Sequence, residues 1–209
     1  RALIDAADRP IAAPSANPSG RISPSTAKHV LDGLDGRLDL VLDGGSCESG
    51  LESTIIDCTG DIARLLRPGG ITRDPLAAAL VAANCNSQIE IVEPLADHEN
   101  PVAPGQLASH YAPKAPVRLM AKTSTADEEL IGFGTVSGAG KLALNLSPSG
   151  DLVEAAANLF SILHAVDAAN IAKIAIAPIP DTGLGEAIND RLRRAAAPRQ
   201  ARAPAFRAQ

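Results

Sequence analysis

The stretch EPLADHENPVAPGQLASHYAPKAP, residues 93–116, decides how the fold is organised. It carries five prolines and shows neither the two-residue period of a strand nor the 3.6-residue period of a helix. Because proline fixes φ and removes a backbone donor, such a stretch continues neither element. We interpret it as a linker that divides the 209-residue chain into two regions.

Both regions alternate short apolar runs with amphipathic stretches, a pattern typical of α/β proteins. Before the linker, the pattern predicts helices at residues 25–34 and 75–83 and strands at residues 11–13, 38–42, 54–58, 63–66 and 89–92. After the linker, it predicts strands at residues 117–120, 130–133, 142–146 and 171–177. The sequence therefore predicts two α/β regions in series.

Two helices are predicted in the second region. The first has an apolar stripe at spacings of three and four that packs on a sheet, formed by Leu152, Ala156, Leu159, Leu163 and Val166. The second covers residues 185–196 and places Ile188 and Leu192 on one face. Asp190 and Arg194 lie four residues apart on the other face, with the arginine toward the end that favours positive charge.

The composition excludes several classes of protein. Hydrophobic residues make up 45% and charged residues 21%, which argues against disorder, and no apolar run approaches the roughly 18 residues of a membrane span. Cys47, Cys58 and Cys85 are odd in number and show no C-x-x-C spacing, so neither a disulfide framework nor a zinc site is predicted. A reducing cytoplasm fits this pattern best. The net charge of −5 disfavours broad adhesion to nucleic acid.

The two ends of the chain carry separate expectations. The chain starts with Arg1 and its only methionine is Met120, so we expect further residues upstream of position 1. The opening RALIDAADRP is typical of a helix and not of a targeting signal. Six arginines and no acid follow from Arg191 to the end. They predict a solvated basic tail, with an anion or RNA contact as the alternative.

The segment PSANPSGRISPS, residues 14–25, lies between a predicted strand and a predicted helix. Hydroxyls, an amide and a glycine at such a junction can bind phosphate or carboxylate, because backbone N–H groups and the helix N-terminus both favour anions. The candidate donors are Ser15, Asn17, Ser19, Ser23 and Ser25. The alternative, which composition alone favours, is a set of ordinary turn residues with Ser23 or Ser25 as the helix N-cap.

Three further segments place polar groups near strand ends. GGSCESGLESTIID, residues 44–57, brings Glu52, Ser53 and Thr54 after a glycine-rich turn, where they suit a small polar ligand. LLRPGGIT, residues 65–72, holds Arg67 in a turn that suits phosphate, although a turn arginine also pairs with surface acids. In the linker, His110 precedes Tyr111, the chain's only tyrosine, whose ring either covers a ligand or anchors the linker.

The familiar catalytic fingerprints are missing from these segments. Neither the P-loop pattern G-x-x-x-x-G-K-[ST] nor the dinucleotide pattern G-x-G-x-x-G occurs at these junctions. The four histidines form no H-E-x-x-H, and there is no G-x-S-x-G nucleophile elbow. No catalytic side chain and no protein metal site are therefore predicted.

Five segments in order, SANPSGRISPS, GLESTIID, LRPGGIT, SHYAP and GLGEAINDRLRRAA, resemble the long, two-domain form of L-threonylcarbamoyladenylate synthase. The resemblance implies the C-terminal half of a YrdC-like twisted α/β domain over residues 1–92, a proline-rich linker over 93–116, a small Rossmann-like α/β domain over 117–197 and a basic tail over 198–209. The first three motifs are common to the YrdC-like superfamily, and the last two point to the two-domain form.

The resemblance also implies a reaction. L-threonine, bicarbonate and ATP give threonylcarbamoyl-AMP and pyrophosphate, and other proteins transfer the threonylcarbamoyl group to tRNA. Magnesium is expected on the ATP, held by phosphate oxygens rather than by a dedicated protein site. By motif, Ser15 and Ser53 would contact threonine. The ATP contacts would be Asn17, Ser25, Arg67 and Tyr111.

The same resemblance limits what this chain is expected to do alone. The family's first half, which supplies much of the threonine and triphosphate pocket, has no counterpart here, so the 209-residue chain is expected to be inactive by itself. A non-catalytic YrdC-like module that binds RNA or a nucleotide is the main alternative. A carbamoyltransferase of hydrogenase maturation and a degenerate gene product are two others.

Overall fold

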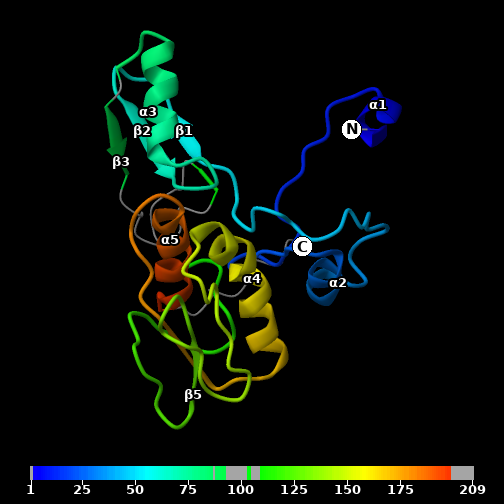
Figure 1. Ribbon diagram of the computed structural model, residues 1–209. Coiled ribbons are helices and arrows are strands. Elements are labelled where there is room, and N and C mark those ends of the chain that lie inside the picture. Colours follow the sequence, from blue (N-terminus) through cyan, green and yellow to red (C-terminus); the bar gives the residue numbers. More distant parts are fainter. Residues whose placement is uncertain (1, 87, 93–102, 105–108, 199–209) are drawn as a thin grey trace.

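The structure is a computed structural model that describes residues 2–86, 88–92, 103–104 and 109–198 (Figure 1). Its strands form two three-stranded sheets, one on each side of the linker, and helices accompany both. This confirms the predicted α/β class. Most of the predicted linker and the tail beyond Pro198 lie outside the described residues. No helix in the described part is long and apolar enough to cross a membrane.

The first sheet has the order β1-β2-β3 and is built from β1 (Ile55–Asp57), β2 (Ala63–Arg67) and β3 (Ile89–Ile91). β1 runs antiparallel to β2, whereas β3 runs parallel to it after the crossover helix α3 (Arg73–Ala82). Along β2 the side chains of Ala63, Leu65 and Arg67 are buried, as the two-residue period of a strand requires. Arg67 is therefore presented at the end of a buried row.

Two short helices precede this sheet. α1 (Ala2–Ala7) stands away from both sheets in Figure 1. α2 (Ala27–Leu34) begins after Thr26, whose hydroxyl accepts a hydrogen bond from the His29 N–H at 3.2 Å. Neither Ser23 nor Ser25 caps this helix, so that part of the turn interpretation is wrong. Thr26 takes the role because its extended backbone places the hydroxyl over the first turn.

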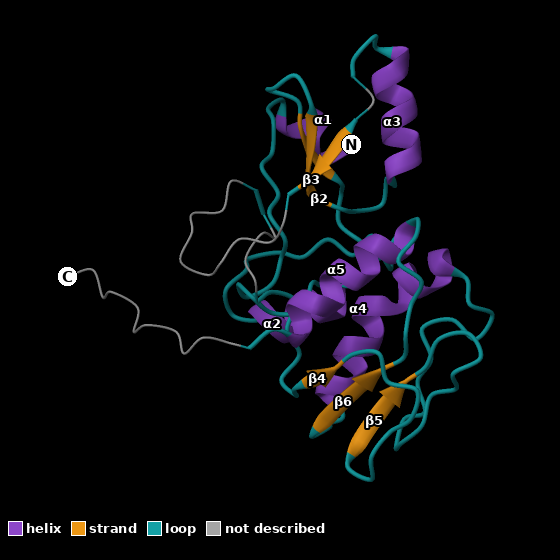
Figure 2. Cartoon of the chain, turned by 90° about the vertical axis from the view of Figure 1, so that its left-hand side faces the viewer, coloured by secondary structure: helices purple, strands orange, loops and turns teal. Residues whose placement is uncertain are grey.

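The second sheet has the order β4-β6-β5 with all strands parallel: β4 (Val117–Arg118), β5 (Glu128–Ile131) and β6 (Lys173–Ile176). α4 (Leu152–Ala168) links β5 to β6, and α5 (Leu184–Ala196) ends the described fold. Both helices lie on the same side of this sheet in Figure 2. The main core forms between them and the strands, with members that include Ile131, Ile174, Leu159, Leu163 and Ile188.

Three predicted strands are wrong. Residues 11–13 and 38–42 are irregular, because no described strand lies beside them to complete a hydrogen-bonded ladder, and Leu40 is 76% exposed. Residues 142–146 make only an isolated parallel bridge from Asn145 to Gly132. Here Ala143 adopts a left-handed φ of 49°, which breaks the extended backbone.

The predicted apolar stripe of α4 is confirmed, because Ala156, Leu159, Leu163 and Val166 are buried. The picture of a solvated basic segment from Arg191 onward is wrong within the described residues. Asp190, Arg191 and Arg194 are buried together with the apolar face of α5. These charges tolerate burial because they pair with one another and with the first region.

The two regions pack on each other through α4 and α5. The ring of His29 in α2 stacks on His164 of α4 with the centroids 3.9 Å apart. Gly50 approaches α4 so closely that an added Cβ would lie 2.1 Å from the Ala156 carbonyl oxygen. At the other end, Arg73 of α3 forms an ion pair with Glu186 of α5. Helices α4 and α5 of the second region thus form the contact surface for the first region.

Candidate active site

A cleft of about 400 Å³ opens where segments from three parts of the chain meet. The first segment precedes α2, the second surrounds β1 and β2, and the third is the described part of the linker. Its walls are formed by Ala13, Pro14, Ser15, Ser23, Glu52, Ser53, Arg67, Pro104, His110 and Tyr111. The cleft therefore combines small hydroxyls, one carboxylate, one guanidinium, one imidazole and one phenol ring.

Arg67 is the cation of this cleft, and its side chain is fixed by carbonyl groups. Its Nε and Nη2 donate to the Ser53 carbonyl oxygen at 3.1 and 2.9 Å, and its Nη1 donates to the Pro104 carbonyl oxygen at 3.2 Å. Nη2 also lies 3.3 Å from the Ser53 hydroxyl. Within the described residues no carboxylate forms an ion pair with Arg67, so its charge stays available for an anion.

The turn after Arg67 packs tightly on the strand end that carries Ser53. A Cβ added to Gly69 would lie 2.4 Å from both the Glu52 carbonyl oxygen and the Thr54 nitrogen. The Gly70 N–H donates to the same Glu52 carbonyl oxygen at 3.2 Å. This close approach explains why glycine follows the Arg-Pro pair, and it fixes the spacing between Arg67 and Ser53.

Glu52 is the carboxylate of the cleft, and it has two partners. The Ser23 hydroxyl donates to its Oε1 at 2.7 Å, and the Nε of Arg191 donates to its Oε2 at 2.9 Å. Burial alone would raise the pKa of Glu52. The charge of Arg191 and these hydrogen bonds outweigh that effect and lower the pKa below its usual value.

Tyr111 brings the linker into the cleft. It is 1% exposed and adopts a φ of 59°, a left-handed conformation that is rare for an aromatic residue. Its ring contacts Phe160 of α4 and, edge to face, His110. Burial raises the pKa of Tyr111 and lowers that of His110, which in both cases favours the neutral side chain.

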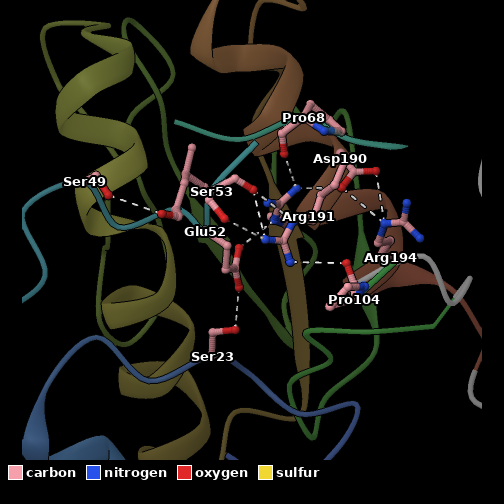
Figure 3. Close-up of polar contacts among 11 residues, drawn as sticks. Ser23, Ser49, Glu52, Ser53, Pro68, Pro104, Asp190, Arg191 and Arg194 are labelled. Carbon is pink, nitrogen blue, oxygen red and sulfur yellow. Dashed lines mark hydrogen bonds and ion pairs between the residues drawn. The ribbon is translucent and has the colours of Figure 1, made fainter. Parts of the chain in front are cut away.

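Charged side chains of α5 lie next to the polar residues around this cleft (Figure 3). Arg191, with a side chain only 1% exposed, bonds Glu52 and also donates through Nη1 to the Pro68 carbonyl oxygen and the Asp190 carboxylate, both at 2.8 Å. Its guanidinium carbon lies 5.3 Å from the centre of the Tyr111 ring. Asp190 in turn accepts from the Nε of Arg194 at 3.0 Å.

The structure brings together four of the six residues singled out from the sequence. Ser15, Ser53, Arg67 and Tyr111 all line the cleft. Asn17 does not line it; its Nδ2 donates to the Pro18 and Arg21 carbonyl oxygens at 3.2 and 3.1 Å.

Ser25 also lies away from the cleft lining. Its hydroxyl is 3.2 Å from the Nδ1 of His29 and 2.9 Å from the Ser161 hydroxyl of α4, and the residue is 3% exposed. Its position couples α2 to α4. The expectation that Asn17 and Ser25 contact ATP stays a prediction.

Sequence reasoning missed Arg191 as part of the site. The usable signal was its position in α5, because Ile188, Arg191, Leu192 and Ala195 follow the three-and-four spacing of the buried face. An arginine on an apolar stripe needs a buried partner. The partner, Glu52, lies 139 residues earlier in the chain, a separation that local patterns do not reveal.

Comparison with protein families supports the resemblance seen in the motifs. Residues 71–197 match the family described as threonylcarbamoyl-AMP synthase, C-terminal domain, and residues 1–69 match a family described as telomere recombination. A Bacillus subtilis threonylcarbamoyl-AMP synthase is 37% identical over 93% of this chain and 59% of its own length. A Pyrococcus abyssi protein of the same name is 34% identical over 92% of this chain and 59% of its own length.

Solved structures give the same result. A crystal structure of P. abyssi Sua5 complexed with L-threonine matches with a TM-score of 0.78 and 31% identity, covering 93% of this chain and 60% of that one. A variant of P. abyssi Sua5 in which a histidine and the tyrosine after it are alanine matches with a TM-score of 0.76 and 30% identity, over 93% of this chain and 59% of that one. The chain spans about three fifths of the length of these relatives, and it belongs to the threonylcarbamoyl-AMP synthase family.

Proposed function

We propose that the protein containing this chain forms threonylcarbamoyl-AMP and pyrophosphate from L-threonine, bicarbonate and ATP, and that the described cleft is one wall of its active site. The observation that carries the proposal is the arrangement of Arg67. A buried guanidinium without an acidic partner among the described residues lies beside Ser53 and next to a cleft wall formed by Tyr111. This arrangement suits a phosphate on one side and a small polar substrate on the other.

In the proposed reaction, the threonine amine and bicarbonate condense to a carbamate with loss of water. A carbamate oxygen then attacks the α-phosphorus of ATP, the new O–P bond forms, and the bond to the β-phosphate oxygen breaks to release pyrophosphate. No side chain needs to act as a nucleophile. The task of the protein is to align the carbamate with the α-phosphate and to stabilise negative charge.

Four cleft residues contact substrates in this proposal. Ser15 and Ser53 offer hydroxyls to the threonine, as befits a family whose P. abyssi member was crystallised with L-threonine. Arg67 binds a phosphate, and the ring of Tyr111 packs against the nucleotide. His110–Tyr111 in the linker is the one adjacent histidine–tyrosine pair of this sequence, and we take it as the counterpart of the pair replaced in that P. abyssi variant.

Magnesium enters the proposal as an ion on the ATP, where it would neutralise phosphate charge. The donor set of the cleft fits this role better than a protein cage, because its one carboxylate, Glu52, already accepts hydrogen bonds from Ser23 and Arg191. Phosphate oxygens and water are then the natural ligands. We further propose a cytoplasmic location, where the exposed free Cys47, Cys58 and Cys85 stay reduced, and downstream partners that transfer the threonylcarbamoyl group to tRNA.

The direct test is pyrophosphate release that depends on both threonine and bicarbonate. It is measured for the 209-residue chain and for a version extended to the full length of its relatives. We expect release from the extended version. Binding of ATP without threonine-dependent release by either version would support the alternative, a non-catalytic module that binds a nucleotide or RNA.

The role of Arg67 is tested in the extended version by Arg67→Ala, with Arg64→Ala as the matched control. Arg64 lies on the same strand but is exposed and faces Asp57 and Glu90. Loss of a charge-assisted hydrogen bond to phosphate should weaken ATP binding at least tenfold in the first variant and leave it unchanged in the second. Equal ATP affinity in both variants would remove Arg67 from the site.

A further inference from the structure

We propose that Arg191, on the last helix of the fold, is a positioning residue for the substrate cleft: it holds Glu52 and the Tyr111 ring in the arrangement that binds ATP. This inference rests on the proposed function, because it concerns a residue that supports the lining of the same cleft. It gives the C-terminal helix α5 a defined part in substrate binding. None of the atoms of Arg191 needs to touch a substrate.

The first step is the number of cleft segments that Arg191 holds. It bonds the side chain of Glu52, the residue before Ser53, and the carbonyl oxygen of Pro68, the residue after Arg67. One guanidinium thus joins the two chain segments that carry Ser53 and Arg67. Because the planar guanidinium of arginine donates hydrogen bonds in two fixed directions, it sets the distance between these two segments.

The second step is the linker. The Arg191 guanidinium carbon lies 5.3 Å from the Tyr111 ring centre, within the range of a cation–π interaction. Tyr111 holds a left-handed backbone φ of 59°, which is unfavourable by itself and needs support from its surroundings. Arg191 and Phe160 provide that support from α5 and α4. The ring is thereby held at the cleft wall.

The third step is charge. Glu52 is a carboxylate in a cleft proposed to bind a triphosphate, so an unpaired Glu52 would repel the substrate. Arg191 pairs with it at 2.9 Å, and Asp190 balances the second buried arginine, Arg194. Arg67 then keeps its charge for the ligand. The same pairing turns the Glu52 carboxylate toward α5 and leaves the Ser23 hydroxyl as its cleft-side donor.

The test compares Arg191→Met with Arg193→Met. Methionine keeps the length of the side chain but removes the charge and every donor. Arg193 is exposed on the same helix, and its substitution changes the net charge equally. ATP affinity is measured by calorimetry with Mg-ATP, in the 209-residue chain and its extended version, at a temperature where circular dichroism shows each protein folded. We expect at least tenfold weaker ATP binding for Arg191→Met and none of this loss for Arg193→Met.

Two more variants separate positioning from simple stability. Arg191→Lys keeps the positive charge but loses the planar set of guanidinium donors. We therefore expect an ATP affinity between those of the unsubstituted chain and Arg191→Met. Glu52→Gln combined with Arg191→Met removes the uncompensated carboxylate, so it should recover much of the lost unfolding temperature but only the part of the ATP affinity that charge repulsion had removed. Recovery of full ATP affinity in this double variant would overturn the proposal, as would an Arg191→Met affinity within twofold of the unsubstituted chain.

A ligand-free readout distinguishes failure of this inference from failure of the proposed function. The chain has one tyrosine and no tryptophan, so its near-ultraviolet circular dichroism has a tyrosine band that reports on Tyr111 alone. Arg191→Met should weaken this band, and Arg193→Met should not. If the unsubstituted proteins bind no ATP, the proposed function fails while the band still tests the positioning. An unchanged band in folded Arg191→Met would overturn the positioning role.

Discussion

The regions before and after the linker contain similar elements but bury them very differently. None of the helices α1, α2 and α3 buries a residue, whereas α4 buries seven and α5 buries eight. Large exposed apolar side chains gather in the first region, including Leu38, Leu40 and Leu42. Secondary structure thus forms in both regions, but among the described residues the main core lies where two helices cover the parallel sheet, and Ile22 and Leu51 of the first region join it.

The candidate site shows why this difference matters. All of its lining residues come from the first region and the linker, yet residues of the second region support them. A cleft on a thinly packed region keeps its geometry because Arg191 and Phe160 hold it from a well-packed one. Stability and function should therefore respond differently to substitutions in the two regions.

The largest effect is expected at Asp190. This buried carboxylate accepts from Arg191 at 2.8 Å and from Arg194 at 3.0 Å, so Asp190→Ala removes the negative charge that two buried guanidinium groups share. Breaking such a network costs about 3–5 kcal/mol of unfolding free energy. The control is Asp32→Ala in the first region, where the partner Lys28 and the carboxylate are both exposed and no measurable change is expected. Urea unfolding of both variants makes the comparison, and equal losses would contradict it.

The next largest effect on the unfolding free energy is expected from a matched pair of leucine substitutions. Leu163 of α4 is 1% exposed, and Leu163→Ala should cost about 2–5 kcal/mol through lost burial and the cavity it leaves. Leu40, before the first sheet, is 76% exposed, so Leu40→Ala should leave the unfolding free energy unchanged. Chemical denaturation of the two variants and the unsubstituted chain under the same conditions measures both changes in unfolding free energy. A substantial loss at Leu40 would mean that its apolar side chain is covered in solution.

Predictions from the sequence also succeeded more often in the second region than in the first. The stripe of α4 was predictable because Leu159, Leu163 and Val166 repeat at helical spacing and are buried as that spacing requires. The strand at residues 38–42 was not, because an apolar run becomes a strand only when a neighbour completes its hydrogen bonds. A local sequence pattern indicates the propensity of a segment to form a strand, but a neighbouring strand decides whether that strand forms.

The site divides in the same way. Ser53 and Arg67 were accessible from sequence because each sits at a strand end beside a glycine turn, where polar groups commonly meet ligands. Arg191 was not recognised, since its partner Glu52 is supplied by another region of the chain. Thr26 shows a smaller failure: several hydroxyls precede α2, and only backbone geometry selects the one that caps it.

The N-caps of α2 and α4 give a smaller test of the comparison. Asp151 accepts from the Val153 and Glu154 N–H groups, so Asp151→Ala should lower the global unfolding free energy by about 1 kcal/mol. Thr26→Ala removes a similar bond from α2, which buries no residue. Its effect should appear as faster hydrogen exchange of the α2 amides, with global unfolding unchanged. A global loss at Thr26 equal to that at Asp151 would show that α2 unfolds together with the core.

The smallest expected effect concerns the contact between α2 and α4 as pH falls. Burial, together with the charge of His164, lowers the pKa of His29, and burial lowers that of His164. Protonation would also break the bond in which the His29 Nδ1 accepts from the Ser25 N–H at 3.3 Å. Because both folded-state pKa values lie below the unfolded value of 6.5, the unfolded chain takes up protons first. This contribution to stability is complete above pH 6.5 and is lost as the pH falls through the folded-state values.

The measurement is the thermal unfolding midpoint between pH 7.5 and pH 5, for the unsubstituted chain and for His29→Gln with His164→Gln. Carboxylates titrate in both proteins, so the difference between their pH profiles isolates the histidine pair. We expect the unsubstituted chain to lose more stability over this interval than the double variant, and α2 to show the earliest gain in hydrogen exchange. Parallel profiles would mean that the stacked rings do not stabilise the contact between the two regions.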